Sequence, residues 1–188
     1  MLRGKKELDR KLESIANIVN RQGRRIMAKT VLDIRKVILD RTVRGIDANG
    51  KPFRGYSAKP GYFMSPYFKD RYRYMGKRGR PIKSIWAPGG YREYKAKTRR
   101  SAGGTVNLFY TGNMLGAMKP LMTKPQYGAV GYSGKPEEEK KARAHNSGAG
   151  NLPKREFMGL TDTESTKILE DYKRRYKQEV RNAISRAH

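Results

Sequence analysis

Apolar residues recur at helical spacing through the N-terminal part of the chain, from about Lys6 to Thr42. The stripe consists of Leu8, Leu12, Ile15, Val19, Ile26, Ile34 and Val37, and Arg41 continues its spacing. Lys and Arg residues occupy most of the remaining positions, and this pattern predicts an amphipathic helix. Gln22 and Gly23 interrupt the middle, so we expect either one long bent helix or two joined helices. Such a helix packs on the protein's own sheet or lies along the outside of a ring of subunits.

The C-terminal segment carries a second helical pattern with a clear start signal. Thr161 followed by Glu164 has the spacing of a capping box, in which each side chain accepts a hydrogen bond from an N–H group of the first turn. One apolar face then follows up to Ala187, made of Ile168, Leu169, Tyr172, Tyr176, Val180 and Ile184. We therefore predict a closing helix over this segment.

Two short strands are predicted between the helices. The segments Ala117 to Met122 and Tyr127 to Tyr132 face each other across Lys124, Pro125 and Gln126, as in a hairpin. Val106 to Tyr110 indicates a short strand or the entry to a helix. The charged run from Pro136 to Lys141 predicts a solvent-facing link or a short helix.

A long stretch without regular period separates the first helix from these strands. Gly45 to Phe53 ends the helix, and Asn49-Gly50 inside it is the strongest turn dipeptide of the chain. From Arg54 to Gly104 neither a period of 2 nor one of 3.6 persists, and seven of the twelve tyrosines fall between Tyr56 and Tyr94. We expect an extended insertion over residues 54–104, ordered on contact with partners. At 188 residues, the whole chain suits a single domain, 1–188.

Composition adds a strong preference for anionic partners. The chain has 43 Lys and Arg against 17 Asp and Glu, a formal net charge of +26, with 36% hydrophobic residues and a mean hydropathy of -0.89. Nucleic acid, an acidic protein ring and an anionic membrane would each satisfy this charge. The absence of cysteine excludes disulfides, thiolate nucleophiles and thiolate metal sites. No apolar run approaches the length of a membrane span, and no signal-peptide core follows the basic N-terminus, so we expect a protein made and kept in a cytoplasm.

The most basic part of the insertion, from Lys69 to Arg100, interleaves Lys and Arg with Tyr. Cations neutralise phosphates and Tyr rings stack on bases, but Tyr and Arg are also the enriched anchors of protein interfaces. Protein contact is the favoured interpretation, ahead of nucleic-acid contact and a merely solvated loop. The candidate partner-interface residues are Tyr67, Arg71, Tyr72, Arg73, Tyr74, Arg78, Arg80, Trp86, Arg92, Arg99 and Arg100.

Patterns that would indicate an enzyme are weak. Gly45-x4-Gly50-Lys51 has P-loop spacing, but Pro52 stands where Ser or Thr would hold magnesium, and a helix rather than a strand precedes it. His145 and His188 are the only histidines, and no sequence pattern ties an acid to His145. A structural role for His145 is therefore the favoured interpretation. We predict no catalytic residues, no metal site and no cofactor.

Several short motifs follow one another in a consistent order. They are the turn Gly45 to Phe53, the element Tyr91-Arg92-Glu93-Tyr94-Lys95, the segment Leu108 to Leu115, the strand Tyr127 to Gly131, the Gly-rich loop Ala142 to Gly148, and the extended segment Pro153 to Leu160. Within them, the residues expected to carry structure are Thr111, Gly112, His145, Gly148, Pro153, Arg155 and Phe157. A bidentate partner of Arg155 would fix the loop that carries His145.

In this order the motifs resemble those of the tail-completion, or virion-morphogenesis, family of tailed bacteriophages, which includes minor tail protein Z-like proteins. The resemblance covers nearly all of the chain except Arg54 to Gly90. It implies an α+β fold, in which a small antiparallel sheet packs against the long N-terminal helix and the C-terminal helix, with a long irregular basic Tyr-rich insertion.

The resemblance also implies a function. Family members look like non-enzymatic ring subunits of the virion neck that complete the tail tube, as tail terminators do, and join it to the head connector. The implied partners are further copies of the chain in a hexameric ring, neighbouring tail-tube and head-connector proteins, and genomic DNA in the channel, with no membrane. The competing interpretation is a basic nucleic-acid-binding protein that uses residues 69–100. A hydrolase or nuclease role finds no convergent acid, base or metal ligands in the sequence.

Overall fold

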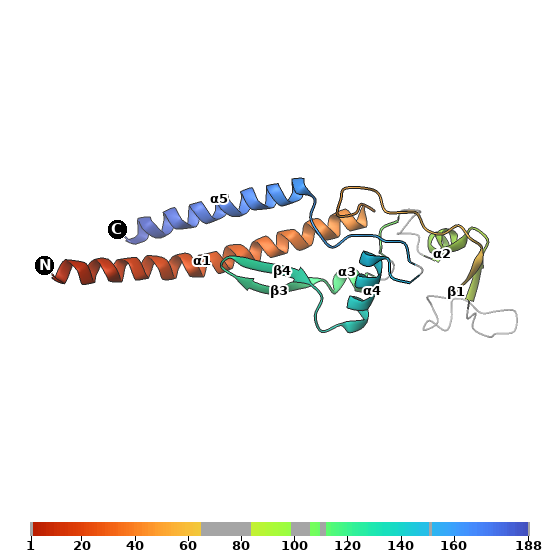
Figure 1. Cartoon of the computed structure of the whole chain (residues 1–188), viewed down its shortest axis with the longest axis horizontal. Coiled ribbons are helices and arrows are strands. Elements are labelled where there is room, and N and C mark those ends of the chain that lie inside the picture. Colours follow the sequence, from red (N-terminus) through yellow and green to blue (C-terminus); the bar gives the residue numbers. More distant parts are fainter. Residues whose placement is uncertain (1, 65–83, 99–105, 110–111, 151, 188) are drawn as a thin grey trace.

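The computed structural model describes residues 2–64, 84–98, 106–109, 112–150 and 152–187. Two long helices form most of the molecule: α1 (Leu2–Val43) and α5 (Asp162–Ala187). They lie side by side and antiparallel, and the N-terminal end of α1 extends beyond the C-terminal end of α5 (Figure 1). Arg175 of α5 forms an ion pair with Asp33 of α1 at 2.7 Å, which joins the two helices at their middle.

The first helix is continuous through Gln22 and Gly23, so of the two expected forms the structure has one long helix rather than two joined helices. A glycine inside a helix costs only about 1 kcal/mol relative to alanine, and packing readily offsets that cost. Gly23 is buried, and a Cβ at this position would lie 3.3 Å from Cβ of Pro125 and 3.7 Å from the ring of Tyr176. The glycine therefore marks a close contact of α1 with the hairpin turn and with α5.

The predicted hairpin is confirmed. Strands β3 (Lys119–Lys124) and β4 (Tyr127–Gly131) pair antiparallel, from Lys119 opposite Gly131 to Lys124 opposite Tyr127. The hairpin packs against α1, and its turn touches α5, where the hydroxyl of Tyr172 donates a hydrogen bond to the carbonyl of Pro125 at 3.0 Å. The fold is thus α+β, with a small antiparallel sheet on the N-terminal helix and in contact with the C-terminal helix.

The capping box of α5 is also confirmed. The N–H of Thr161 donates to the carboxylate of Glu164 at 2.8 Å, and the N–H of Glu164 donates to the hydroxyl of Thr161 at 3.2 Å. The predicted apolar face is only partly buried, however. Leu169 and Ile184 are 51% and 44% exposed, because they lie at the edge of the less exposed face of α5 and not within it.

Residues 54–104 contain more regular structure than expected. Strands β1 (Gly61–Met64) and β2 (Ser84–Ala87) form a second antiparallel pair, and helix α2 (Gly90–Thr98) packs against both. We call β1, β2 and α2 the lobe; it lies at the end of the molecule opposite the two termini (Figure 1). These elements could not be predicted from the sequence, because each strand or helix is too short to show a hydrophobic period.

We call the rest of the described chain the body, and the main core lies within it, beside the C-terminal part of α1. Two further helices, α3 (Asn113–Gly116) and α4 (Pro136–Ser147), complete the body at this end. The core cluster contains Ile38, Phe53, Met114, Leu115, Met118, Ala142 and Phe157. Val106 to Phe109, expected as a strand or helix entry, belongs to neither type of element. None of the described helices has an apolar stretch long enough to span a membrane.

Candidate functional site

The turn after α1 is shaped by its own polar groups. Gly45 ends the helix with φ of 80°, a value that favours glycine. The carboxylate of Asp47 then accepts hydrogen bonds from the N–H groups of Asn49 and Lys51, both at 2.8 Å. The N–H of Phe53 donates to the carbonyl of Gly45 at 2.7 Å and closes the turn. These hydrogen bonds within the segment make it a turn that ends the helix, and Pro52 and the preceding helix had already spoken against a P-loop.

The segment from Pro153 to Leu160 docks on this turn and on α4. The N–H of Ala48 donates to the carbonyl of Glu156 at 2.6 Å. The side-chain oxygen of Asn146 accepts from the N–H groups of Phe157 at 3.0 Å and Met158 at 2.9 Å. These bonds hold the Phe157 ring in the core, where it is completely buried.

Arg41 joins the same segment to both long helices. Its side chain is 2% exposed, and its guanidinium donates to the carbonyls of Phe157 and Gly159, each at 2.8 Å. It also forms an ion pair with Glu164, the capping residue of α5. A buried guanidinium needs such partners, because an unpaired buried charge is costly. In the sequence, Arg41 continues the spacing of the apolar stripe, and that spacing does not indicate its contacts with the docked segment and α5.

Residues Ala144 to Ser147 are helical, so the expected Gly-rich loop is wrong for this segment. They form the last turn of α4, and Gly148 ends the helix with φ of 75°. A Cβ on Gly148 would lie 2.9 Å from the backbone nitrogen of Lys154. The chain therefore reverses here, and the N–H of Arg155 donates to the carbonyl of His145 at 2.8 Å.

Aromatic rings hold the lobe together. Phe63 of β1 lies 5.6 Å from the ring of Tyr91 and 5.2 Å from that of Tyr94, while Tyr56 lies 5.2 Å from Tyr91. The carboxylate of Glu93 accepts a hydrogen bond from the N–H of Gly89 at 2.5 Å and pairs with Lys97. These two partners, Lys97 first, lower the pKa of Glu93.

A cavity of about 990 Å³ lies between the lobe and the body. Its cationic lining residues are Arg54, Lys59, Lys95 and Arg155, and His145 lines it as well. Its apolar and aromatic lining residues include Tyr56, Phe63, Tyr91, Leu108, Leu152 and Pro153. No acidic residue of the described chain lines it. Cavities of this size at the junction of two substructures are common ligand sites.

Lys95 lies at the wall of this cavity and is only 1% exposed. Its ammonium donates to the hydroxyl of Tyr56 at 2.5 Å and to the side-chain oxygen of Asn107 at 2.7 Å. It also lies 4.5 Å from the centroid of the Tyr56 ring. Burial, and secondarily the charge of Arg155, lowers the pKa of Lys95 to about 8.

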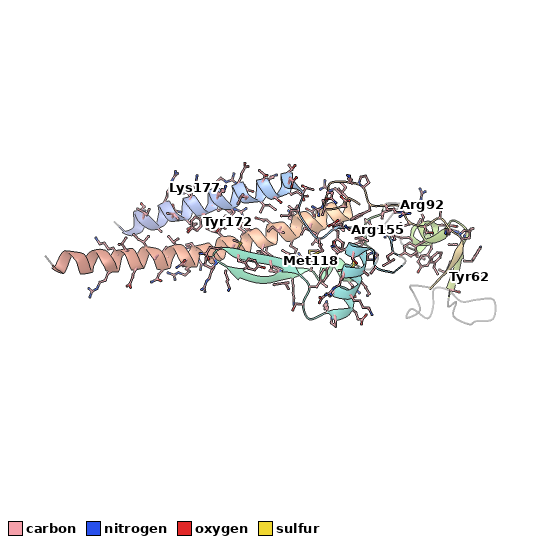
Figure 2. The ribbon with its side chains drawn as sticks, viewed as in Figure 1. Tyr62, Arg92, Met118, Arg155, Tyr172 and Lys177 are labelled. Atoms are coloured by element: carbon pink, nitrogen blue, oxygen red, sulfur yellow. The ribbon has the colours of Figure 1, made fainter. Side chains whose placement is uncertain are left out.

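Arg155 also lies beside this tyrosine, with its guanidinium carbon 5.0 Å from the centroid of the Tyr56 ring, and is 3% exposed. Figure 2 shows Arg155 near the junction of the body and the lobe. Its guanidinium donates to the carbonyls of Arg54 at 3.2 Å and Gly55 at 3.4 Å. The guanidinium of Arg155 thus binds the backbone of residues 54–55 rather than the segment that carries His145. The contact with His145 is made by the backbone N–H of Arg155, which donates to the His145 carbonyl. Burial lowers the pKa of Arg155.

His145 also lines the cavity. Within the described part of the chain, its buried Nδ1 has no hydrogen-bond partner. Burial, followed by the positive charge of Arg155, lowers the pKa of His145. Leu108, also in the lining, is the one non-glycine residue of the described chain with positive φ, at 49°. Backbone strain of this kind is frequently found at functional sites.

The structure describes only part of the predicted partner surface. The candidates Tyr67, Arg71, Tyr72, Arg73, Tyr74, Arg78, Arg80, Arg99 and Arg100, together with Thr111 of the motif set, lie outside the described residues. Trp86 and Arg92 are exposed on the lobe, and the Trp86 ring lies 4.8 Å from that of Tyr62. Gly112 precedes α3 with φ of 81°, where a Cβ would lie 3.0 Å from the Phe109 ring. Tyr56 was not singled out in the sequence, and Lys95 was named only as the last residue of the element Tyr91 to Lys95, since a lysine gives no sequence signal of burial.

The described residues contain no group of three or more His, Cys, Asp or Glu side chains placed to hold a metal ion. Comparisons of the chain with protein-family models, curated proteins and solved structures find no match.

Proposed function

We propose that this chain is a non-enzymatic structural protein of a tailed-phage virion. In this proposal it completes the tail tube and joins it to the head connector, as one subunit of a hexameric ring in the neck of the virion. Its partners are further copies of itself and the neighbouring tail-tube and connector proteins, with DNA passing through the channel.

One observation supports the proposal most strongly: the motifs that carry the resemblance supply the core. Phe53 comes from the turn after α1, Met114 and Leu115 from the segment at α3, Ala142 from α4, and Phe157 from the docked segment. Val130 of β4 packs against the same cluster. Motifs that matched by chance would have no reason to meet in one core. Their convergence favours a shared architecture, and the role is inferred from that architecture.

The surface of the long helices suits lateral contacts between subunits. Large apolar side chains are exposed along them, at Leu12 (55%), Leu32 (54%), Leu169 (51%) and Ile184 (44%). Burial of these side chains between neighbouring subunits would contribute favourable free energy to association.

Electron microscopy of lysates from the phage that carries this gene, with the gene deleted, tests the proposal. We expect filled heads beside unattached tails if joining fails, and tails of irregular length if termination fails. The wild-type gene supplied in trans should restore complete particles, and this complementation controls for effects on neighbouring genes. Complete and infectious virions without the gene would contradict the proposal.

A nucleic-acid-binding role is the second candidate, and the lobe provides an observation in its favour. Tyr62 and Trp86 form a tilted aromatic pair, 72% and 50% exposed, on the lobe, which also carries the exposed Arg92. Exposed aromatic rings next to cations can stack on unpaired bases. A phosphate-driven complex of this kind loses affinity log-linearly with salt, so a salt titration of binding to single-stranded DNA tests this candidate.

A further inference from the structure

The cavity between lobe and body concentrates positive charge that nothing in the described chain balances. Lys95 and Arg155 are both buried beside the Tyr56 ring, and their hydrogen-bond acceptors are neutral: a hydroxyl, an amide oxygen and backbone carbonyls. No described carboxylate lies within ion-pair distance of either cation. Each therefore carries a desolvation cost that its neutral partners offset only in part.

Arg41 provides an internal comparison. It is as deeply buried as Arg155, but the carboxylate of Glu164 compensates its charge. The described part of the chain thus supplies a counter-ion for one buried cation and none for the pair at the cavity. Because the uncompensated pair borders an open space rather than the packed core, a counter-ion can reach it from outside the chain.

We propose that this cavity is an anion-binding site, which accepts the carboxylate of an Asp or Glu side chain from a partner protein. The carboxylate would lie in the cavity beside Lys95 and Arg155, near His145, which also lines it. The apolar walls, which include Phe63, Leu108 and Leu152, would contact the residues that flank the acidic one.

The burial of the two cations favours a side-chain carboxylate over a nucleic-acid phosphate. Exposed cations suffice for a phosphate backbone, whereas Lys95 and Arg155 are 1% and 3% exposed. A carboxylate on a flexible stem can enter a walled cavity, and the apolar lining matches a peptide better than a sugar-phosphate chain. The choice of a protein as the carrier rests on the proposed function, while the preference for an anion does not.

The test uses two short peptides, N-acetyl-Leu-Glu-Leu-amide and its neutral counterpart N-acetyl-Leu-Gln-Leu-amide. Both are titrated into the full chain while NMR follows the ring signals of His145 and the side-chain signals of Lys95. We expect saturable shifts with the Glu peptide at a Kd of about 1 mM, and binding of the Gln peptide weaker by at least about tenfold. An anion beside the imidazole should also raise the pKa of His145.

Two variants on the same helix localise the binding. Lys95→Met removes the buried charge at nearly constant length and should abolish the shifts of the His145 ring. Lys97→Met removes a cation that is 62% exposed and paired with Glu93, and should bind the Glu peptide like the wild type. The comparison between the two peptides on the wild-type chain remains decisive if Lys95→Met does not fold.

Three results would overturn the proposal: no shift with the Glu peptide up to about 10 mM, equal shifts with both peptides, or unchanged binding by a folded Lys95→Met variant. Shifts of the same signals by a thymidine oligonucleotide, lost on adding salt, would overturn the choice of a protein partner. Because the titration uses the isolated chain, its failure leaves the gene-deletion test of the proposed function unaffected.

Discussion

A single guanidinium connects the end of α1, the docked segment and the start of α5. Replacing Arg41 by Met leaves the carbonyls of Phe157 and Gly159 and the carboxylate of Glu164 without their shared donor. Breaking a buried ion pair from one side costs about 3–5 kcal/mol. We expect Arg41→Met to lower the free energy of unfolding by about this amount, measured by urea denaturation.

The matched control is Arg44→Met, one turn along the chain. Arg44 is exposed, and its side chain donates only to the carbonyl of Asp40 at 3.2 Å. Its replacement should change the free energy of unfolding by no more than about 0.5 kcal/mol. Equal losses in the two variants would show that Arg41 does not connect these elements.

Lys95 makes stability depend on pH in the alkaline range. Its pKa is about 8 in the folded chain and 10.5 at its ordinary value, so between these limits the unfolded chain binds more protons. Stability from this group therefore rises as pH increases from 8 toward 10.5, by on the order of 2–3 kcal/mol in total. We expect the free energy of unfolding of the wild type, relative to Lys95→Met, to increase between pH 7 and pH 9.5.

Other groups titrate in the same range, but they are common to both proteins and cancel in the difference. In Lys95→Met the side-chain oxygen of Asn107 loses the lysine donor but still accepts a hydrogen bond from the N–H of Phe109 at 3.2 Å. A difference in stability that stays constant with pH would contradict the lowered pKa. At neutral pH, Lys95→Met should be no less stable than the wild type.

The sequence indicated some of these residues and hid others for physical reasons. Gly148 and Phe157 stand out because few residue types fit a helix end with positive φ or a fully buried pocket. Arg41 carried a partial signal, since it continues the apolar spacing of α1. Lys95 carried none, because its burial depends on Tyr56 and Asn107, which lie far from it in sequence.

At the scale of elements, the hairpin β3–β4 packs on α1 through a glycine. A Cβ on Gly128 would lie 2.3 Å from Cγ2 of Val31 and 3.1 Å from Sδ of Met27. Gly128→Ala therefore forces the strand away from the helix, and overpacking of this kind costs about 1–3 kcal/mol. We expect a corresponding fall in the free energy of unfolding, measured by urea denaturation.

Gly116→Ala is the control for this change, because a Cβ there meets no atom within 4 Å and its φ is not positive. Alanine at such a site should be neutral or stabilise by up to about 1 kcal/mol through the unfolded state. If Gly128→Ala were as stable as Gly116→Ala, the close approach of β4 to α1 would be wrong.

The elements that could be predicted from the sequence are those in which a hydrophobic period persists over several turns or a local signal is strong. Helix α5 has a capping box and several turns of apolar spacing, and β3–β4 has a short turn between two strands. The lobe was missed, because β1 and β2 have four residues each and pair across a separation of about twenty in the chain. Pairing at that distance leaves no local period to detect.

At the scale of the whole molecule, the exposed apolar residues favour association of copies of the chain, and the net charge opposes it. The paired helices present exposed apolar residues along an elongated body, while a net charge of +26 makes copies of the chain repel one another (Figure 1). Association through the helices therefore needs the repulsion to be screened or neutralised. An acidic partner, or salt in its place, would do so.

This opposition gives the two candidate functions opposite responses to salt. Salt screens repulsion between like-charged copies, with a Debye length that falls from about 10 Å at 0.1 M to about 3 Å at 1 M. A ring interface with an apolar centre should therefore strengthen or persist as salt rises, whereas a complex with phosphates weakens. We expect sedimentation velocity of the pure chain to show larger oligomers at about 0.5 M NaCl than at about 0.05 M.

A charge placed on the exposed apolar face tests where the copies meet. Leu169 is 51% exposed on α5, so Leu169→Glu should leave the monomer folded yet prevent the oligomer, because a carboxylate would be buried in the interface. Gln178→Glu adds the same charge at an exposed position of α5 and should assemble like the wild type, because nine residues of helix, or two and a half turns, place it on the opposite side of α5 from Leu169. A wild-type chain that stays monomeric at every salt concentration, or a Leu169→Glu chain that assembles normally, would place the subunit contacts elsewhere than on α5.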